Sequence, residues 1–216
     1  MFKSLSFAQL FLSIFFLTCS CSEIEPAKNE GDPLNVNVEL LTDAGGTTHH
    51  AAKIEFTYEG KAPLTIVSDD EKGVIAPTPV KKIQLDATHY YLIGTSSPGG
   101  GMDRWHVLSI VVSPEKIELR QELVYSVARL SLGIVSSKEK PNRIGVVIPS
   151  DNPPASDDWE LSMDGSKRSL GDLRNRPVKA ANENDVNSYG SILKPSEKIR
   201  VLWYSLEGDG TFKENN

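Results

Sequence analysis

Apolar and polar residues alternate along much of the chain after residue 33. The runs 34–40 and 54–58 show the pattern most clearly, because every second residue in them is aliphatic or aromatic. Such alternation places one side of a β-strand on a core and the other in solvent. About ten segments of this kind recur at intervals of about ten residues, with turn residues between them, which predicts strands. The predicted strands lie at 34–40, 54–58, 64–66, 83–85, 90–93, 105–112, 117–119, 123–127, 130–134, 144–148 and 199–204.

This spacing predicts an all-β protein in the form of an antiparallel β-sandwich. Helical periodicity is confined to two short, weak patterns near 170–174 and 182–189. An alternation of strands and helices, which defines α/β folds, is therefore not expected. The layout is similar to that of immunoglobulin-like sandwiches. The cysteine and tryptophan framework of that family is missing, so the similarity rests on strand spacing alone.

The stretch 150–196 breaks the pattern, because it is poor in branched apolar residues and rich in Asp, Asn, Ser, Pro and Lys. We therefore expect a long polar insertion before the last predicted strand, one that the core does not require. Structureless loops of this length are uncommon in compact domains, which favours a functional role or partial ordering by short elements. Beyond Gly208 we expect a turn and then a frayed tail.

The first residues form a separate pattern. Lys3 precedes an apolar run over 5–17, and a short basic start followed by such a run is typical of a secretion signal. The run is shorter than the roughly 20 apolar residues that span a bilayer. A buried N-terminal helix is the alternative, but the run has no helical stripe and the chain becomes polar directly after it.

The end of this run, Leu17-Thr18-Cys19-Ser20-Cys21, resembles the lipobox of bacterial lipoproteins. The resemblance implies that a cysteine is acylated and becomes the new N-terminus after cleavage. Cys21 is the expected site because the small Ser20 precedes it, and Cys19 is the second choice. Several acyl chains on one cysteine would hold the protein on a membrane, since each buried methylene contributes about 0.8 kcal/mol.

These patterns predict three parts of the chain. A cleaved secretion signal covers 1–20, a tether covers 21–33, and a β-sandwich domain covers 34–216 and includes the insertion at about 150–196. The tether contains Pro, Gly and charged residues, a composition typical of linkers. The expected location is the cell envelope, where the protein would be lipid-anchored on the extracytoplasmic side of a membrane.

Composition narrows the function classes. The chain has 23 basic and 29 acidic residues, a formal net charge of −6, and no basic cluster. Nucleic-acid binding is therefore not expected, and the lipid is the expected membrane contact. The two cysteines of the chain are those at the lipobox. We accordingly expect no disulfide, cysteine nucleophile or iron–sulfur cluster in the domain, and no cofactor.

Known catalytic motifs are absent from the sequence. It contains neither a Gly-x-Ser-x-Gly nucleophile elbow nor a His-Glu-x-x-His zinc motif. The run Gly99–Gly101 lacks the lysine of a phosphate-binding loop, and we expect a hairpin turn there, between 90–93 and 105–112. These absences argue against an enzyme. A hydrolase whose residues converge only in space is compatible with the sequence.

The histidines are the candidate ligands of a copper or zinc site. They are His49, His50, His89 and His106. Adjacent histidines on a strand point to opposite faces. A hairpin centred on Gly99–Gly101 would place His106 beside Leu92. It would place His89 beside Ser109, so the two rings would not face each other, and we expect no metal.

Trp159 is the candidate contact residue. Trp105 and Trp203 lie inside apolar strands and are expected in the core. Trp159 instead follows Asp157 and Asp158 in the polar insertion, where no core periodicity explains it. It either pins the insertion to the sandwich or is exposed for binding. We take Trp159, Asp157 and Asp158 as candidate binding residues.

The sequence as a whole favours an exported lipoprotein that acts without catalysis, as a binding, assembly or envelope-interaction module. Its expected partners are a membrane, through the lipid anchor, and an envelope protein or a glycan. The alternatives are an envelope hydrolase and a metal-binding lipoprotein that uses the four histidines.

Overall fold

The computed structural model describes most of the predicted domain. The described residues are 32–42, 48–69, 74–97, 102–128, 133–148, 159–163, 166–169, 179–190 and 198–215. Within them the regular elements are fifteen strands and one short 3-10 helix, Glu183–Asp185. The predicted all-β class is therefore confirmed. The signal and the lipobox, with Cys19 and Cys21, lie outside the described residues.

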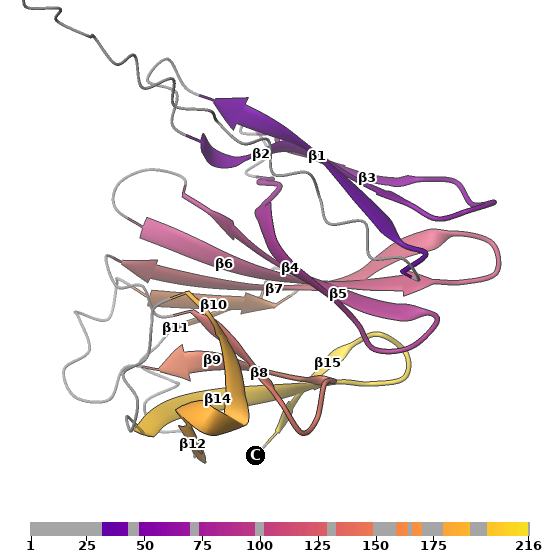
Figure 1. The fold of residues 1–216 in the computed structure, drawn as a ribbon. Coiled ribbons are helices and arrows are strands. Elements are labelled where there is room, and N and C mark those ends of the chain that lie inside the picture. The colour runs from indigo at the N-terminus through magenta and orange to yellow at the C-terminus, as the bar shows by residue number, and fades with distance from the viewer. Residues whose placement is uncertain are drawn as a thin grey trace, which may run out of the picture.

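The strands form three sheets that stack as layers (Figure 1), and every pairing between named strands is antiparallel. The first sheet has the order β1-β2-β3. Its strands are β1 (Asn35–Thr42), β2 (Thr48–Thr57) and β3 (Leu64–Val67).

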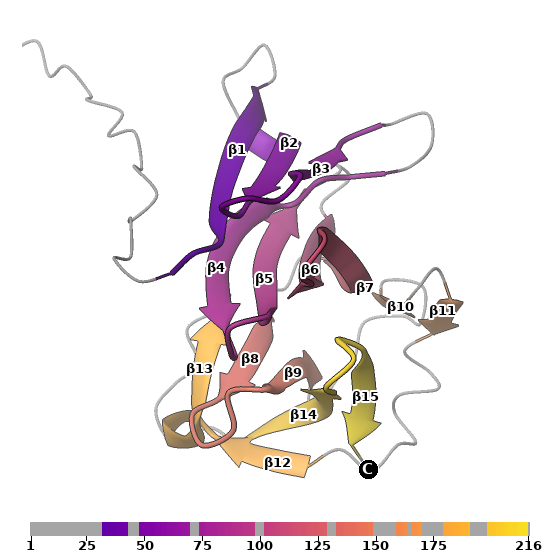
Figure 2. The same ribbon diagram turned by 90° about the vertical axis from the view of Figure 1, so that its right-hand side faces the viewer.

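The second sheet is the middle layer and has the order β11-β10-β7-β6-β5-β4. Figure 2 shows β10 and β11 continuing this layer beyond β7. Its strands are β4 (Thr78–Gln84), β5 (His89–Ser96), β6 (Met102–Val112), β7 (Ile117–Ala128), β10 (Trp159–Met163) and β11 (Ser166–Ser169).

The third sheet has the order β12-β14-β9-β8-β13, with β15 paired to β14. Its strands are β8 (Ile134–Ser137), β9 (Arg143–Ile148), β12 (Lys179–Asn182), β13 (Val186–Tyr189), β14 (Lys198–Leu206) and β15 (Phe212–Asn215).

The middle sheet is buried on both faces, which makes the fold a sandwich with one more layer than the alternation alone predicted. Tyr90 and Leu92 of β5 pack in the cluster shared with the first sheet. Tyr91 and Ile93, their neighbours on the same strand, pack in the cluster shared with the third sheet. A strand covered on both sides carries a continuous apolar run instead of an alternating one, as β5 does.

The polar stretch 150–196 takes part in the core, so the expectation that the core does not require it is wrong. Its strand β10 pairs with β7, and Leu161 on that strand is only 2% exposed. Its strand β13 pairs with β8, and Val186 is 4% exposed. The weak helical pattern at 182–189 is likewise a 3-10 turn and a strand.

The C-terminal segment is a strand, so the expected frayed tail is also wrong. Phe212 of β15 is 6% exposed, and its backbone N–H donates to the Gln121 side chain of β7. In the turn before it, the Gly210 carbonyl accepts a hydrogen bond from the buried hydroxyl of Ser109, at 2.6 Å. These contacts fix the β14–β15 turn against β6 and β7.

The hairpin of β5 and β6 is present, but its predicted register is wrong by two residues. His106 lies opposite Gly94, not Leu92, and His89 lies opposite Val111, not Ser109. A shift of two residues leaves each side chain on the predicted face, because the side-chain period of a strand is two. Within the described residues there is no helix long and apolar enough to cross a membrane.

The expected core tryptophans are in the core. Trp105 is 7% exposed and Trp203 is 8% exposed. Tyr90 and Tyr91 of the middle sheet are fully buried. Burial of these four rings makes core packing their role.

Candidate functional site

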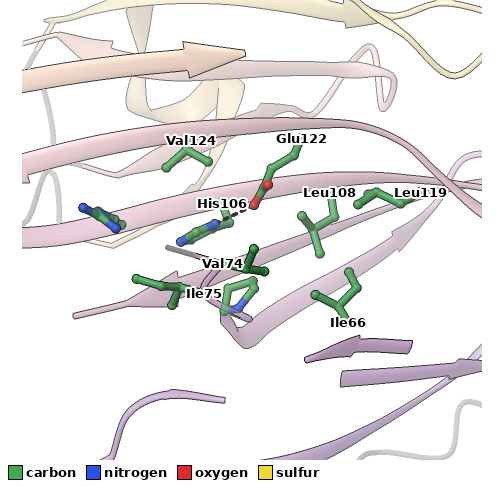
Figure 3. Close-up of a pocket in the computed structure, with 10 residues that line it drawn as sticks. Ile66, Val74, Ile75, His106, Leu108, Leu119, Glu122 and Val124 are labelled. Atoms are coloured by element: carbon green, nitrogen blue, oxygen red, sulfur yellow. Dashed lines mark hydrogen bonds and ion pairs between the residues drawn. The ribbon is translucent and has the colours of Figure 1, made fainter. Parts of the chain in front are cut away.

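A pocket of about 250 Å³ lies between the first sheet and strands β6 and β7 of the middle sheet. Its walls are mostly apolar, and Figure 3 shows them around the labelled ring of His106. The apolar lining residues are Ile66, Val74, Ile75, Pro77, Leu108, Leu119 and Val124. Arg104, His106 and Glu122 supply the polar part of the lining. An apolar cavity with a few convergent polar groups is the usual form of a small-molecule site.

The wall formed by residues 74–77 is held in place by Ser68. The hydroxyl of Ser68 donates to the Ala51 carbonyl of β2 at 2.6 Å, and it accepts the backbone N–H of Ala76 at 2.9 Å. The Ala51 N–H donates in turn to the Ala76 carbonyl at 2.9 Å. The segment is therefore tied to the first sheet by hydrogen bonds, which keep the pocket open beside β6 and β7.

Gly94 makes room for this wall on the middle sheet. A Cβ at Gly94 would lie 2.8 Å from Pro77 Cβ and 2.9 Å from the Thr78 carbonyl oxygen, both closer than real contacts allow. Gly94 is also the residue opposite His106. The missing side chain lets the 77–78 backbone pack directly on β5, next to the imidazole.

Three polar side chains on adjacent strands form a hydrogen-bonded chain, in which His106 and Glu122 line the pocket and Ser96 is buried beside His106. The hydroxyl of Ser96 on β5 lies 2.8 Å from His106 Nε2 on β6. His106 Nδ1 lies 2.8 Å from Glu122 Oε1 on β7, and Figure 3 shows this second contact. The register makes each step a diagonal neighbour, since Gly94 and Val124 are directly opposite His106.

The donor and the acceptor of each hydrogen bond between Ser96, His106 and Glu122 can be assigned. An ionised carboxylate can only accept, so the Nδ1–H of His106 donates to Glu122. In the neutral ring Nε2 then carries the lone pair and accepts the Ser96 hydroxyl. Ser96 is 2% exposed and His106 is 3% exposed, whereas the Glu122 side chain is 38% exposed. The carboxylate therefore reaches solvent while the other two groups are enclosed.

Arg104 gives the pocket a positive group. It lies directly opposite Ser96 in the β5–β6 pair and lines the same cavity. Among the residues that the structure describes, no carboxylate forms an ion pair with it. A guanidinium is always charged and presents donors that match a carboxylate or phosphate. The pocket therefore combines apolar walls with a cation that an anionic group can neutralise.

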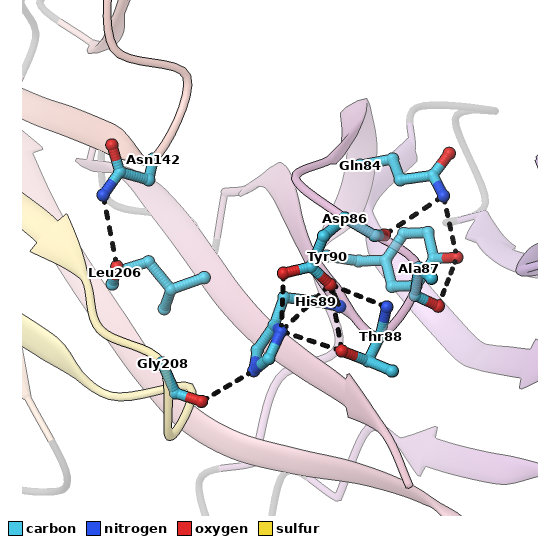
Figure 4. Close-up of polar contacts among 9 residues, drawn as sticks. All are labelled: Gln84, Asp86, Ala87, Thr88, His89, Tyr90, Asn142, Leu206 and Gly208. Atoms are coloured by element: carbon cyan, nitrogen blue, oxygen red, sulfur yellow. Dashed lines mark hydrogen bonds and ion pairs between the residues drawn. The ribbon is translucent and has the colours of Figure 1, made fainter.

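His89 belongs to a different, structural cluster (Figure 4). Its Nδ1 lies 3.0 Å from both Asp86 oxygens, and its Nε2 lies 3.0 Å from the Gly208 carbonyl oxygen. The ring therefore joins the β4–β5 turn to the β14–β15 turn. Burial alone would raise the pKa of Asp86, but hydrogen bonds from the Thr88 backbone and the His89 ring outweigh it and hold that pKa well below its usual range.

Of the other two histidines, His50 has a described side chain. His50 lies on β2 opposite Leu41, and both its ring nitrogens are buried without a hydrogen-bond partner in the described part. The side chain of His49 lies outside what the structure describes. No three His, Cys, Asp or Glu side chains converge in a metal-binding arrangement within the described ranges.

The predicted binding residues of the insertion are only partly described. Trp159 begins β10, opposite Val127 of β7, and its side chain lies outside the described part. Asp157 and Asp158 lie outside the described residues altogether. Their binding role stays a prediction.

Sequence reasoning missed Ser96, Arg104 and Glu122. Strand period places Arg104 on the face of His106, and the predicted hairpin register, which pairs even-numbered residues with each other, also places Ser96 there. Glu122 was harder to find. A register shift between Ser109 and Ile110 separates the two halves of the β6–β7 pair, and the sequence does not reveal it.

No protein-family description matches this chain, and it shows no significant similarity to a curated protein or to a solved structure.

Proposed function

We propose that this chain is an exported, lipid-anchored binding module whose ligand site is the pocket between the first and middle sheets. The observation that carries the proposal is the guanidinium of Arg104, which lines a mostly apolar cavity and has no ion-pair partner among the described residues. Such a cavity suits an amphipathic ligand with an apolar body and one anionic group. The charged group would gain two charge-assisted hydrogen bonds from Arg104, which are about twice as strong as neutral ones.

The size of the cavity limits the ligand. A cavity of about 250 Å³ is slightly smaller than the roughly 300–1,000 Å³ of most small-molecule pockets, so it suits a small ligand. A short acyl chain with a carboxylate fits this volume, whereas a long lipid would have to extend out of the pocket. Val74 and Leu119, at the pocket, are 43% and 37% exposed, so apolar surface continues towards the opening.

Octanoate tests the ligand class, with octanol as the uncharged comparison. We expect the full mature protein to bind octanoate more tightly than octanol in isothermal titration calorimetry. Arg104→Met should remove that preference and weaken octanoate binding about tenfold or more, because a hydrogen bond to a charged group contributes about 1.5–3 kcal/mol. Arg200→Met, on β14 of the third sheet, is the matched control. Equal binding of the two ligands by the unchanged protein would contradict the proposal.

The lipid anchor has its own test. We expect membrane-extracted protein to begin at Cys21 and to carry acyl mass, because the lipobox-like end places Ser20 before that cysteine. Cys21→Ser should remove the acyl mass, while Cys19→Ser should keep it. Intact-mass spectrometry measures both. A mature protein without acyl mass, or one that still begins at Met1, would contradict lipid anchoring.

A further inference from the structure

Ser96 differs from other buried serines of the fold in what its hydroxyl contacts. Ser109 donates to the Gly210 carbonyl, and Ser136 bonds to the Tyr189 hydroxyl. Both contacts satisfy a polar group inside a sheet and need no further explanation. The hydroxyl of Ser96 instead faces the Nε2 atom of an imidazole. A serine next to a general base is the arrangement that activates a nucleophile.

From this arrangement we propose that Ser96, His106 and Glu122 form the catalytic triad of a serine hydrolase that cleaves small carboxylic esters with an apolar acyl chain, with the ester in the pocket that His106 and Glu122 line. The proposal rests on the proposed function, because the ester would occupy the same cavity. Both distances in the chain are 2.8 Å, and they use opposite nitrogens of one ring. Nucleophile, base and orienting carboxylate are thus each within hydrogen-bond reach of the next.

Arg104 supplies the electrostatic stabilisation that ester cleavage needs. Directly opposite residues of an antiparallel pair have Cβ atoms about 4.5–5.5 Å apart, and Arg104 is the residue opposite Ser96. Its guanidinium donors can meet the negative oxygen that forms when the hydroxyl attacks a carbonyl. The same cation then holds the carboxylate product, which is the anionic amphiphile of the proposed function.

The reaction proceeds through an acyl-serine. Ser96 Oγ bonds to the ester carbonyl carbon and gives its proton to His106 Nε2. The bond from that carbon to the alkoxy oxygen breaks, and the alcohol leaves with the proton from Nε2. Water then attacks the acyl carbon and gives a proton to Nε2. Ser96 Oγ departs, takes that proton back and releases the carboxylic acid, with no change of oxidation state.

Glu122 is a positioning residue in this scheme. By accepting the Nδ1–H it fixes the ring in the tautomer whose Nε2 is the base. It also stabilises the imidazolium that forms during the attack. Its exposure, 38% of the side chain, means that bulk water can compete for the same oxygen, so its removal should be less damaging than removal of the base.

Two assays on the full mature lipoprotein in detergent test the nucleophile. The first is hydrolysis of p-nitrophenyl butyrate, and the second is labelling by a fluorophosphonate, which reacts with activated serines. We expect turnover in the unchanged protein, and peptide mass mapping should place the label on Ser96. Ser96→Ala should lower kcat at least a hundredfold and abolish labelling. Ser109→Ala, which removes a buried hydroxyl at a distance from the pocket, should retain both.

Substitutions of the base, His106, and of the positioning residue, Glu122, should have different kinetic effects. We expect His106→Gln to abolish turnover, because His106 Nε2, 2.8 Å from Ser96 Oγ, is the group placed to accept its proton. Glu122→Gln should lower kcat by at least tenfold and change the pH profile of kcat, while Glu122→Asp should restore part of the rate. Glu118→Gln, on the same strand and paired with Lys116, is the control and should leave the profile unchanged.

Ser96→Cys keeps the proposal testable if Ser96→Ala fails to fold. A cysteine there should be alkylated by iodoacetamide faster than free cysteine at neutral pH, because His106 would accept its proton. Absence of labelling in the unchanged protein, labelling at another serine, or a cysteine no more reactive than the free amino acid would overturn the proposal.

Octanoate binding, measured beside turnover and labelling, distinguishes failure of the hydrolase proposal from failure of the proposed binding function. Binding that depends on Arg104, together with no turnover and no labelling, would leave the binding module and refute the hydrolase. Turnover that requires Ser96 without Arg104-dependent binding of octanoate would support the hydrolase and refute the anionic ligand.

Discussion

Gly210 allows the β14–β15 turn to lie close to β6 because it has no Cβ. Its φ is +83°, a conformation that side chains other than glycine rarely adopt, and a Cβ there would lie 2.5 Å from Val111 Cγ2. The carbonyl of the same residue accepts the Ser109 hydroxyl. The close approach of the β14–β15 turn to β6 therefore depends on glycine at this position.

Gly210→Ala should destabilise the fold by about 1–3 kcal/mol, through both the positive φ and the clash. Gly208→Ala is the matched control in the same turn, because a Cβ there meets nothing within 4 Å. Urea unfolding followed by circular dichroism measures both variants. Equal stability of the two would show that the turn moves away at no cost.

Asp86 makes the stability of the fold depend on pH. Its folded pKa is lowered well below the usual value, although burial opposes this, because it accepts hydrogen bonds from Thr88 and His89. A lowered folded pKa adds stability above the unfolded pKa of about 4, and that stability is lost as pH falls below it. The side chain is 56% exposed, so we expect a contribution of about 1 kcal/mol or less.

Asp86→Asn should therefore be less stable than the unchanged protein at pH 6 and more nearly equal to it at pH 2.5. Thr88→Val removes one donor to the carboxylate and should cause a smaller change of the same sign. Chemical unfolding at the two pH values measures the difference. A gap that is the same at both pH values would mean that the charge of Asp86 does not contribute.

At the residue scale, the sequence predicted on which face of the sheet a side chain lies, but not which residues of the adjacent strands it contacts. The hairpin of β5 and β6 was predicted, and the two-residue register error preserved the faces. The contact between His106 and Ser96 depends on that register. The contact with Glu122 depends further on the irregularity between Ser109 and Ile110. Local residue preferences do not determine either, because packing across the sheet decides them.

At the scale of elements, the strands that sequence reasoning missed are short and polar. β10 has the sequence WELSM and β13 has VNSY, so each offers too few apolar residues for a periodic signal. Pairing with a neighbouring strand, β7 for β10 and β8 for β13, supplies the backbone hydrogen bonds of such a segment regardless of its side chains. The long strands β5, β6 and β7, by contrast, were predicted because each carries repeated apolar residues on at least one face.

Leu161 tests whether β10 is part of the core. Its side chain is 2% exposed and lies in the cluster between the middle and third sheets. We expect Leu161→Ala to cost about 2–5 kcal/mol, since it leaves a cavity in packed surroundings. Leu40→Ala on β1, where the leucine is 50% exposed, should cost far less. Thermal unfolding compares the two, and equal melting temperatures would mean that the polar stretch only rests on the sandwich.

At the scale of the whole molecule, the middle sheet couples the two cores. Tyr90 and Leu92 belong to one core, and Tyr91 and Ile93 belong to the other, yet all four lie on β5. Loss of packing on one face therefore exposes a strand whose other face is still buried. Interiors are close-packed and do not deform gradually, so we expect the three layers to unfold together.

Phe56→Ala tests this coupling by weakening the core between the first and middle sheets. Phe56 is fully buried in the core of the first sheet, while Trp105 belongs to the core shared with the third sheet. The substitution should cost about 3–5 kcal/mol. Trp105 and Trp203 lie on the other side of the middle sheet from Phe56. If the layers unfold together, the unfolding of this variant should nevertheless have the same urea midpoint by tryptophan fluorescence as by circular dichroism. A fluorescence midpoint that stays at the value of the unchanged protein, with an earlier transition in circular dichroism, would show that the first sheet unfolds alone.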